Sequence, residues 1–368
     1  MRTIVQFIKN EIVLVIACSL ATISILFFRP SFKIIYHSID FKVLSLLFSL
    51  MAIIAIFRSY NVLDYCGAWL LRRCKTERGL VFCLVYIVFF FAMLVTNDVG
   101  LLTFVPIALI ICKQANINPI KVIILQTIAA NLGSSVTPMG NPQNLYLFSY
   151  YNFSTIEFFK ITLLLGVVSF ILLFISILLV TKKQPVKTHN QRVLVKIDLP
   201  LILFFIDLVI ILLSVFRIVN YKIGFISTLF LLLIFSPKTI KKIDYSLLIT
   251  FIGFFIFIGT ISQVPQIRDF ISQFVNYPNL TYFTGILSSQ LISNVPAAIL
   301  LSGFTEFGSD LLLAVNIGGL GTIIASLASV ISYKLFSKEN PSETGKYMAQ
   351  FTIWNVSYLL ILMSLFCL

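Results

Sequence analysis

The sequence predicts an all-α polytopic membrane protein with two inverted-topology repeats. Three observations lead to this fold class. Of the 368 residues, 59 % are apolar and only 11 % are charged, which is less than half the charged share of a soluble domain, and the mean hydropathy is +1.02. Apolar runs of about the length of a bilayer crossing recur along the whole chain. Four of them are interrupted in the middle by a polar, Gly-containing or Pro-containing segment.

The apolar runs predict about nine crossings joined by short loops. These runs are 11–28, 43–57, 119–149, 155–181, 199–216, 222–236, 246–263, 311–336 and 347–367. The first run lacks a small-residue cleavage site, so we expect a retained helix rather than a signal peptide. Two further runs, 79–113 and 279–304, are interrupted in the middle by a short polar segment. We expect each to be a re-entrant hairpin, and we expect a short amphipathic helix before each one.

The positions of Lys and Arg orient this topology. With the N-terminus in the cytoplasm, the predicted inner segments carry 20 of the 27 Lys and Arg residues, as the positive-inside rule requires. The sequence therefore predicts a multi-pass protein of the cell membrane with a cytoplasmic N-terminus and an external C-terminus. The net charge of +13 belongs to cytoplasmic loops in this interpretation, so no nucleic-acid partner is expected.

The order of the elements predicts three parts. We expect a first repeat unit at 1–181, a cytoplasmic connector with a linker helix at 182–216, and a second, inverted unit at 217–368. Each unit has a hairpin followed by a broken helix, and the linker helix is the odd crossing that inverts the second unit. Paired interruptions at matching places in two halves are the best sequence pointer to a transporter binding site.

Local sequence supports the pairing of the two units. Residues 130–137 read ANLGSSVT and resemble 315–322, which read VNIGGLGT. Residues 96–99 of the first hairpin read TNDV, and 293–296 of the second read SNVP. Backbone that is not helical survives in hydrocarbon only where it is buried in protein or lines a water-filled cavity. The four interruptions therefore predict one shared cavity.

The two hairpin tips carry residues that cap helices. Thr96 or Asn97 is suited to cap the returning arm of the first hairpin, and Ser293 or Asn294 that of the second. The N-terminus of each returning arm then presents free N–H groups and the positive end of the helix dipole to the cavity. This arrangement favours an anion.

The two breaks cannot be continuous helices. Residues 131–144 contain two Pro and two Gly, and Asn141 before Pro142 indicates a cap and the first residue of a restarted helix. In the second break, the Gly residues of 318–321 permit unwinding, and we expect the freed carbonyls to coordinate a cation. The expected substrate-binding residues are Thr96, Asn97, Ser134, Ser135, Thr137, Asn141, Asn144, Ser293, Asn294 and Thr322. The expected ion-coupling residues are Asp98, Asn131, Gly133, Asn316, Gly318 and Gly319.

Two acidic residues fall within predicted spans. A carboxylate at the bilayer centre costs at least about 2.5–3.5 kcal/mol, so each needs a reason to be there. Asp98 lies in the first tip, where it can carry a proton, help to bind Na⁺ or cap the hairpin. Asp207 lies on the linker helix without a counterpart in the other unit, which favours a structural or cavity-edge role.

Other interpretations remain for single residues. An isolated Gly in a membrane helix is commonly a packing contact, and an isolated Asn or Ser commonly bonds a neighbouring helix. The pairing of all four motifs across two units is what favours a binding site. No catalytic motif, metal-ligand cluster or cofactor motif occurs in the sequence, so we expect no enzyme, and the paired half-helices favour a transporter over a channel.

The motifs TNDVG, ANLGSSVTPMGNPQN, SNVPA and NIGGLGT resemble those of the ion transporter superfamily. It includes arsenite permeases, sodium-coupled dicarboxylate and sulfate carriers, citrate carriers and certain sodium/proton antiporters. The resemblance covers the chain from about residue 43 onward. It implies that the two tips bind Na⁺ together with a substrate carboxylate, and that the protein is a homodimer with alternating access. The pair Asn97-Asp98 looks like the arsenite permeases, whereas Ser293 stands where those permeases have Asp, and Val295 lacks the hydroxyl of the last Thr in the tip of the dicarboxylate carriers.

The functional expectation is a secondary active transporter of a small anion, either a carboxylate or an inorganic oxyanion, coupled to Na⁺ or H⁺. Two alternatives stay open: an arsenite or antimonite efflux permease, and a Na⁺/H⁺ antiporter. Apart from the coupling ion, no cofactor or metal is expected. The expected partners are the anionic substrate, the lipid bilayer and a second copy of the chain.

Overall fold

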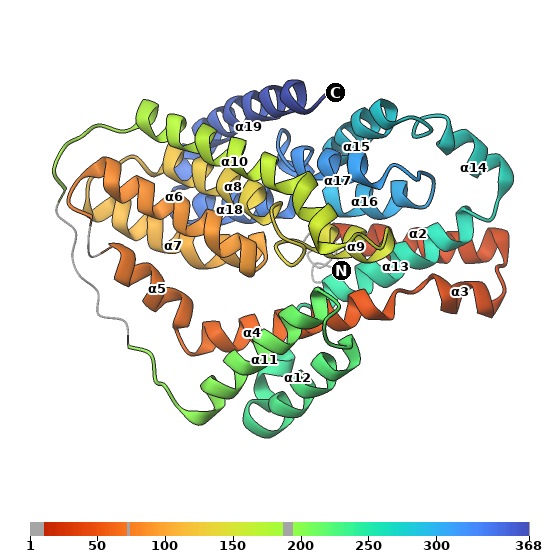
Figure 1. Cartoon of the computed structure of the whole chain (residues 1–368). Coiled ribbons are helices and arrows are strands. Elements are labelled where there is room, and N and C mark those ends of the chain that lie inside the picture. Colours follow the sequence, from red (N-terminus) through yellow and green to blue (C-terminus); the bar gives the residue numbers. More distant parts are fainter. Residues whose placement is uncertain (1–10, 72–73, 187–193, 368) are drawn as a thin grey trace.

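The computed structural model describes residues 11–71, 74–186 and 194–367, and this part of the chain is helical apart from its loops and one isolated bridge between Thr76 and Pro185 (Figure 1). The helices from the N-terminus to the linker are α2 (Ile12–Phe28), α3 (Phe32–Ser38), α4 (Phe41–Ser59), α5 (Val62–Leu71), α6 (Glu77–Leu94), α7 (Asn97–Gln114), α8 (Pro119–Ser134), α9 (Pro142–Tyr150), α10 (Thr155–Val180) and α11 (Leu199–Val215). The remaining helices are α12 (Tyr221–Phe235), η1 (Pro237–Lys242), α13 (Tyr245–Ile261), α14 (Pro265–Ser272), α15 (Pro278–Ile292), α16 (Asn294–Ser302), α17 (Gly308–Ile317), η2 (Ile323–Ala325), α18 (Leu327–Glu339), η3 (Pro341–Glu343) and α19 (Thr344–Phe366).

The prediction of a helical protein with several apolar spans is confirmed. Within the described residues, α4, α6, α7, α10 and the segment of η3 with α19 are long and apolar enough to cross a membrane, and the pair α13 and α14, bent by 103°, would make a sixth span. Helices α2, α11, α12 and α17 are apolar but shorter. The number of nine crossings stays a prediction.

Each predicted hairpin is a pair of helices joined by a tight tip. In the first, α6 and α7 have 18 residues each, or about 27 Å at 1.5 Å per residue. In the second, α15 has 15 residues and α16 has nine. The first hairpin is therefore long enough to reach through most of a bilayer. Whether either is re-entrant stays a prediction.

Both breaks lie where Gly, Pro and Asn predict them. Helix α8 ends at Ser134 and α9 restarts at Pro142, where the Asn141 side chain accepts a hydrogen bond from the N–H of Asn144 at 2.8 Å. In the second unit α17 ends at Ile317, and only the short η2 precedes the restart at Leu327. Gly321 has φ of 97°, a backbone conformation that glycine adopts without strain.

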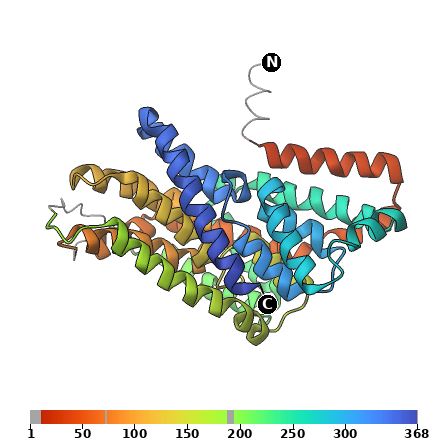
Figure 2. The ribbon, with the colours of Figure 1, turned by 90° about the horizontal axis from the view of Figure 1, so that it is seen from above.

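The helices of the two halves pack crosswise. The returning arm α7 packs against α18, which is the restarted helix of the other half, and α16 likewise packs against α9. In the same way α4 packs against α12, while α13 lies along α2 (Figure 2). Reciprocal packing of this kind is what an inverted repeat would generate, while the division of the chain into units stays a prediction.

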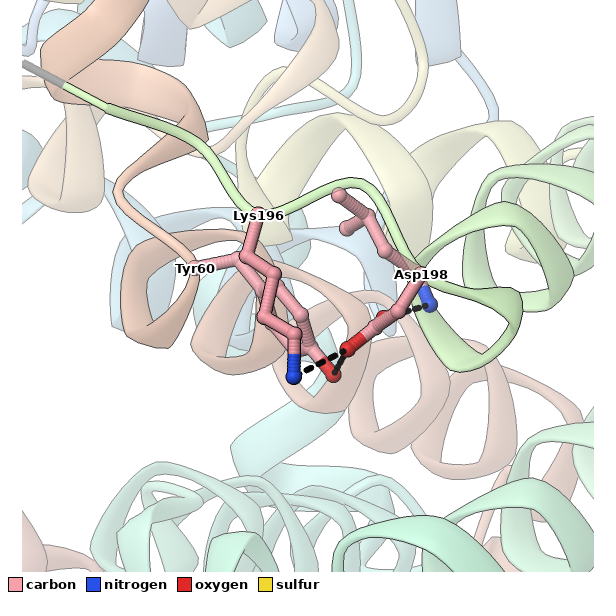
Figure 3. Close-up of polar contacts among 4 residues, drawn as sticks. Tyr60, Lys196 and Asp198 are labelled. Carbon is pink, nitrogen blue, oxygen red and sulfur yellow. Dashed lines mark hydrogen bonds and ion pairs between the residues drawn. The ribbon is translucent and has the colours of Figure 1, made fainter.

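The linker helix is fixed to the end of α4 by a small polar cluster (Figure 3). The Asp198 carboxylate accepts hydrogen bonds from the Leu201 N–H at 3.2 Å and the Tyr60 hydroxyl at 3.4 Å, and Lys196 Nζ lies 3.7 Å away. Burial and the Asp198 carboxylate raise the pKa of Tyr60. Asp198 thus caps α11 and joins the connector to the first unit.

Candidate functional site

Asparagines from both halves meet where the two breaks come together. Asn141 Nδ2 donates to Asn316 Oδ1 at 3.1 Å, and Asn316 Nδ2 donates to Asn144 Oδ1 at 2.7 Å. All three side chains are buried. Because a buried amide that lacks a partner is costly, these contacts hold the first break against the end of α17. The predicted grouping of these residues is present in the structure.

Asn131 joins the first hairpin tip to both breaks. Its Oδ1 accepts from Asn97 Nδ2 at 3.2 Å and from Ser326 Oγ at 2.9 Å, and its Nδ2 donates to the carbonyl of Gly319 at 3.3 Å. The N–H of Asn97 also donates to the carbonyl of Gly140 at 3.2 Å. The start of α7 is therefore tied directly to the first break and, through Asn131, to the second.

Several of these contacts occur in matching pairs. Asn131 accepts from Ser326 of the other half, and Asn316 accepts from Asn141, at equivalent positions of the two motifs. The Thr137 hydroxyl donates to the carbonyl of Met93. In the same way, the Thr322 hydroxyl donates to the carbonyl of Gln290 at 3.1 Å. Both threonines hold a break against the outgoing arm of its own hairpin.

Gln290 is a site residue that the sequence analysis missed. Its Nε2 donates to the carbonyls of Gly318 and Leu320 at 2.7 and 3.0 Å, and its Oε1 accepts from the N–H of Thr322 at 2.9 Å. In the first break, Asn144 Nδ2 is within hydrogen-bond distance of the carbonyls of Ser134, Ser135 and Thr137 at 3.3, 3.0 and 3.1 Å. The only sequence signal for Gln290 is its place one turn before the second tip.

The remaining predicted residues lie around this cluster. Ser134 Oγ accepts from Asn141 and donates within its own helix, and the Ser135 hydroxyl also bonds within α8. Ser293 has φ of 73°, and its hydroxyl donates to the carbonyl of Ala325 at 3.4 Å. Asn294 is buried beside Gly319, whereas Thr322 is exposed.

The predicted glycines allow close approach of the backbone. A Cβ at Gly133 would run into the backbone of Phe89 on α6. A Cβ at Gly318 would meet Ser289 at 2.8 Å, and one at Gly319 would meet the Asn294 amide at 2.7 Å. At Gly133 the structure therefore favours the packing interpretation, because a side chain there would push α8 away from the first hairpin.

Asp98 faces a cavity beside the amide cluster. Its N–H donates to Asn97 Oδ1 at 3.0 Å, while its own Oδ1 is shielded from solvent and has no hydrogen-bond partner within the structure. The cavity measures about 450 Å³ and lies between α4, the first tip and the start of α13. Its charged lining residues are Arg58, Asp98, Lys242 and Asp244, and most of the others are apolar.

The second mid-span carboxylate lies elsewhere. Asp207 on α11 accepts hydrogen bonds from Ser227 Oγ at 2.5 Å and Thr228 Oγ1 at 2.7 Å, both on α12. These contacts join the linker helix to its neighbour and favour the structural interpretation. Among the described residues, no group of three His, Cys, Asp or Glu side chains could hold a metal ion.

Comparison with known proteins identifies the family. Residues 5–305 match the citrate transporter family, CitMHS. The chain belongs to this family. It is 34 % identical over 339 residues to an uncharacterised transporter of Methanocaldococcus jannaschii, covering 90 % of each chain, and 28 % identical to the Escherichia coli inner membrane protein YbiR, covering 74 % of this chain and 73 % of that one.

A solved structure supports the fold of this citrate transporter family member. The crystal structure of the Alcanivorax borkumensis YdaH transporter is similar with a TM-score of 0.58 at 13 % identity, covering 88 % of this chain and 84 % of that one. The family and the apolar helices show a multi-pass membrane transporter. The resemblance read from the motifs is thus confirmed at the level of family and fold.

Proposed function

We propose that this protein is a secondary active transporter of a small anion, a carboxylate or an inorganic oxyanion, coupled to Na⁺ or H⁺ and working by alternating access. One observation carries the proposal. The starts of α7, α9 and α18 meet in one buried cluster. Asn97 and Ser326 donate to Asn131, and Asn141 donates to Asn316. Ser134 links the two groups, because it accepts from Asn141 and donates to the carbonyl of Asn131. Helix N-termini and amide N–H groups are the donors that bind anions in proteins.

The chemistry of the cluster suits an anion that is bound and released. Its side chains are neutral amides and hydroxyls, so they can orient carboxylate or oxyanion oxygens without holding them by charge. Asp98 sits beside the cluster through its contact with Asn97 and supplies a group that can gain or lose charge. The cavity of about 450 Å³ is within the range of small-molecule sites.

Citrate is the first anion to test, because it is the substrate that the family description gives. The experiment is uptake of labelled anions into proteoliposomes that contain the purified full chain. Citrate, a dicarboxylate, sulfate and arsenite are compared, each with an imposed Na⁺ gradient, an imposed pH gradient or neither. Saturable uptake of one anion, accelerated by one gradient, is expected. Equal fluxes in loaded and protein-free vesicles for every anion would contradict the proposal.

Two other functions share part of this support. The Asn97-Asp98 pair, of which Asp98 lines the cavity, also suits an arsenite or antimonite efflux permease. A carboxylate that exchanges cations suits a Na⁺/H⁺ antiporter. Resistance of a sensitive host to metalloids would identify the first. A proton flux driven by Na⁺ that needs no anion would identify the second.

The assembly and orientation are proposals of the same kind. We propose a homodimer in the cell membrane with a cytoplasmic N-terminus and an external C-terminus. Light scattering of the purified protein, with the detergent contribution subtracted, gives the number of chains.

A further inference from the structure

A side-chain amide nitrogen lies among the backbone carbonyls of each break. In the second break Gln290 Nε2 is 2.7 Å from the carbonyl oxygen of Gly318 and 3.0 Å from that of Leu320. In the first, Asn144 Nδ2 is 3.0–3.3 Å from three carbonyl oxygens, those of Ser134, Ser135 and Thr137. The two amides come from different elements: Gln290 from the outgoing arm of a hairpin, and Asn144 from a restarted helix.

The orientation of both amides is fixed by their partners. A carbonyl oxygen only accepts and a backbone N–H only donates. Gln290 Oε1 accepts from the N–H of Thr322, so its NH₂ group must face the carbonyls. Asn144 Oδ1 accepts from Asn316 Nδ2, whose own Oδ1 accepts from Asn141. Exchanging O and N in either amide would set oxygen against oxygen.

Carbonyls freed by unwinding are the ligands with which broken transporter helices coordinate Na⁺. A cation and an amide NH₂ group satisfy the same carbonyl lone pairs, and they cannot occupy one position together. Gln290 Nε2 has two hydrogens, and its two nearer carbonyls are those of Gly318 and Leu320 at 2.7 and 3.0 Å, with that of Ile286 at 3.4 Å. Each of the two nearer carbonyls therefore already has a donor. The carbonyl of Gly319 is also satisfied, because it accepts from Asn131 Nδ2 at 3.3 Å.

We propose that the amides of Asn144 and Gln290 take the place of bound cations, so that neither break is a Na⁺ site. The carbonyls that the glycines were expected to free for a cation are instead hydrogen-bonded to side-chain amides of the same chain. The inference rests on the proposed function, because it restricts where the coupling ion of a transporter can bind. The hydrogen bonds from which it is argued do not depend on transport. The inference also predicts that removing an amide creates a cation site.

The test measures thermal unfolding of the purified full chain in NaCl and in choline chloride at equal ionic strength. The wild type gives the reference difference between the two salts, and a Na⁺ effect that arises at a site elsewhere in the protein is expected to persist unchanged in every Gln290 variant. Gln290→Glu removes the donor and sets a carboxylate against two carbonyls, so Na⁺ is expected to raise its midpoint saturably by about 2–4 °C. The rise is expected to be larger at pH 8 than at pH 5, where protonation restores a donor.

Gln126→Glu is the matched control, because Gln126 is a buried glutamine on α8 whose Nε2 donates to a single carbonyl, that of Leu84, at 2.9 Å. It is expected to lower the midpoint equally in both salts. If Gln290→Glu does not fold, Gln290→Met replaces it, because Met93 is the residue at the equivalent position of the first hairpin. The unfolding midpoint of Gln290→Met is expected to rise in Na⁺ by a smaller amount.

Two results would overturn the inference. One is a saturable Na⁺ stabilisation of the wild type that Gln290→Glu or Gln290→Met abolishes. The other is a folded Gln290 variant in which the midpoints in the two salts differ by no more than in the wild type. The comparison of unfolding midpoints in the two salts does not require the protein to transport an anion. A failure of the proposed transport and a failure of this inference are therefore distinguishable.

Discussion

At the scale of single residues, neutral amides make the contacts between the two halves of the site. Asn131, Asn141, Asn144 and Asn316 are all buried, and each has a partner in the other half. Asp98 differs from them, because its Oδ1 is shielded and without a hydrogen-bond partner within the structure. A shielded carboxylate oxygen without a partner is costly when it is charged, so Asp98 is the residue of this site whose charge we expect to change during transport.

Asp98→Asn is expected to leave binding of the anion in place and to abolish the dependence of transport on the coupling gradient. The amide keeps the size of the side chain but can no longer change its charge. Uptake into proteoliposomes with and without each gradient measures the effect. The control is Asp244→Asn, at the mouth of the same cavity, which should keep the dependence. Unchanged coupling in Asp98→Asn would remove this residue from the mechanism.

Asn97→Ala and Asn294→Ala are each expected to weaken anion binding about tenfold, which corresponds to the loss of one hydrogen bond to a charged group. Both residues begin a returning arm and are buried. Calorimetric titration with the transported anion gives the Kd of each variant. Wild-type affinity in both would place the site elsewhere.

At the scale of elements, the hairpins and breaks are the part of the fold that the sequence predicts best. Gly, Pro and Asn act locally, so the restart of α9 at Asn141 and Pro142 is visible in a short stretch of chain. The partners of these residues depend on packing between distant elements. The role of Gln290 could not be predicted, since it depends on how the second hairpin packs against the neighbouring break. The cavity beside Asp98 could not be predicted either, since segments far apart in the chain line it.

Arg217 stabilises the far end of a restarted helix. Its Nη2 donates to the carbonyl of Phe148 at 2.7 Å, and its guanidinium lies 4.9 Å from the centre of the Phe148 ring. Arg217→Ala leaves the C-terminus of α9 without this partner. We expect it to lower the free energy of unfolding by about 1–2 kcal/mol, measured by thermal unfolding. Lys222→Ala, an exposed residue of the following helix, is the control and is expected to have little effect.

At the scale of the whole molecule, we propose that the two halves are inverted, so that matching segments face opposite sides of the membrane; the crosswise packing is consistent with this proposal. Asn116 lies in the loop after the first hairpin, and Arg268 lies in α14, before the second hairpin; both are exposed. We therefore expect Asn116→Cys to react with a membrane-impermeant thiol reagent only from the cytoplasm, and Arg268→Cys only from outside. The background protein has its six cysteines replaced. Labelling of both from one side would refute the inverted repeat.

The packing of α7 against α18 and of α16 against α9 has a consequence for biosynthesis, because each pair joins a helix of the first half to one of the second. The first half leaves the ribosome before any of the helices that complete its surfaces have been made. Until the later segments are inserted, the start of α9 and the amides that are buried in the complete protein have no partners from the second half. Two separately synthesised fragments, cut within the connector, should therefore assemble when they are made together and be degraded when either is made alone.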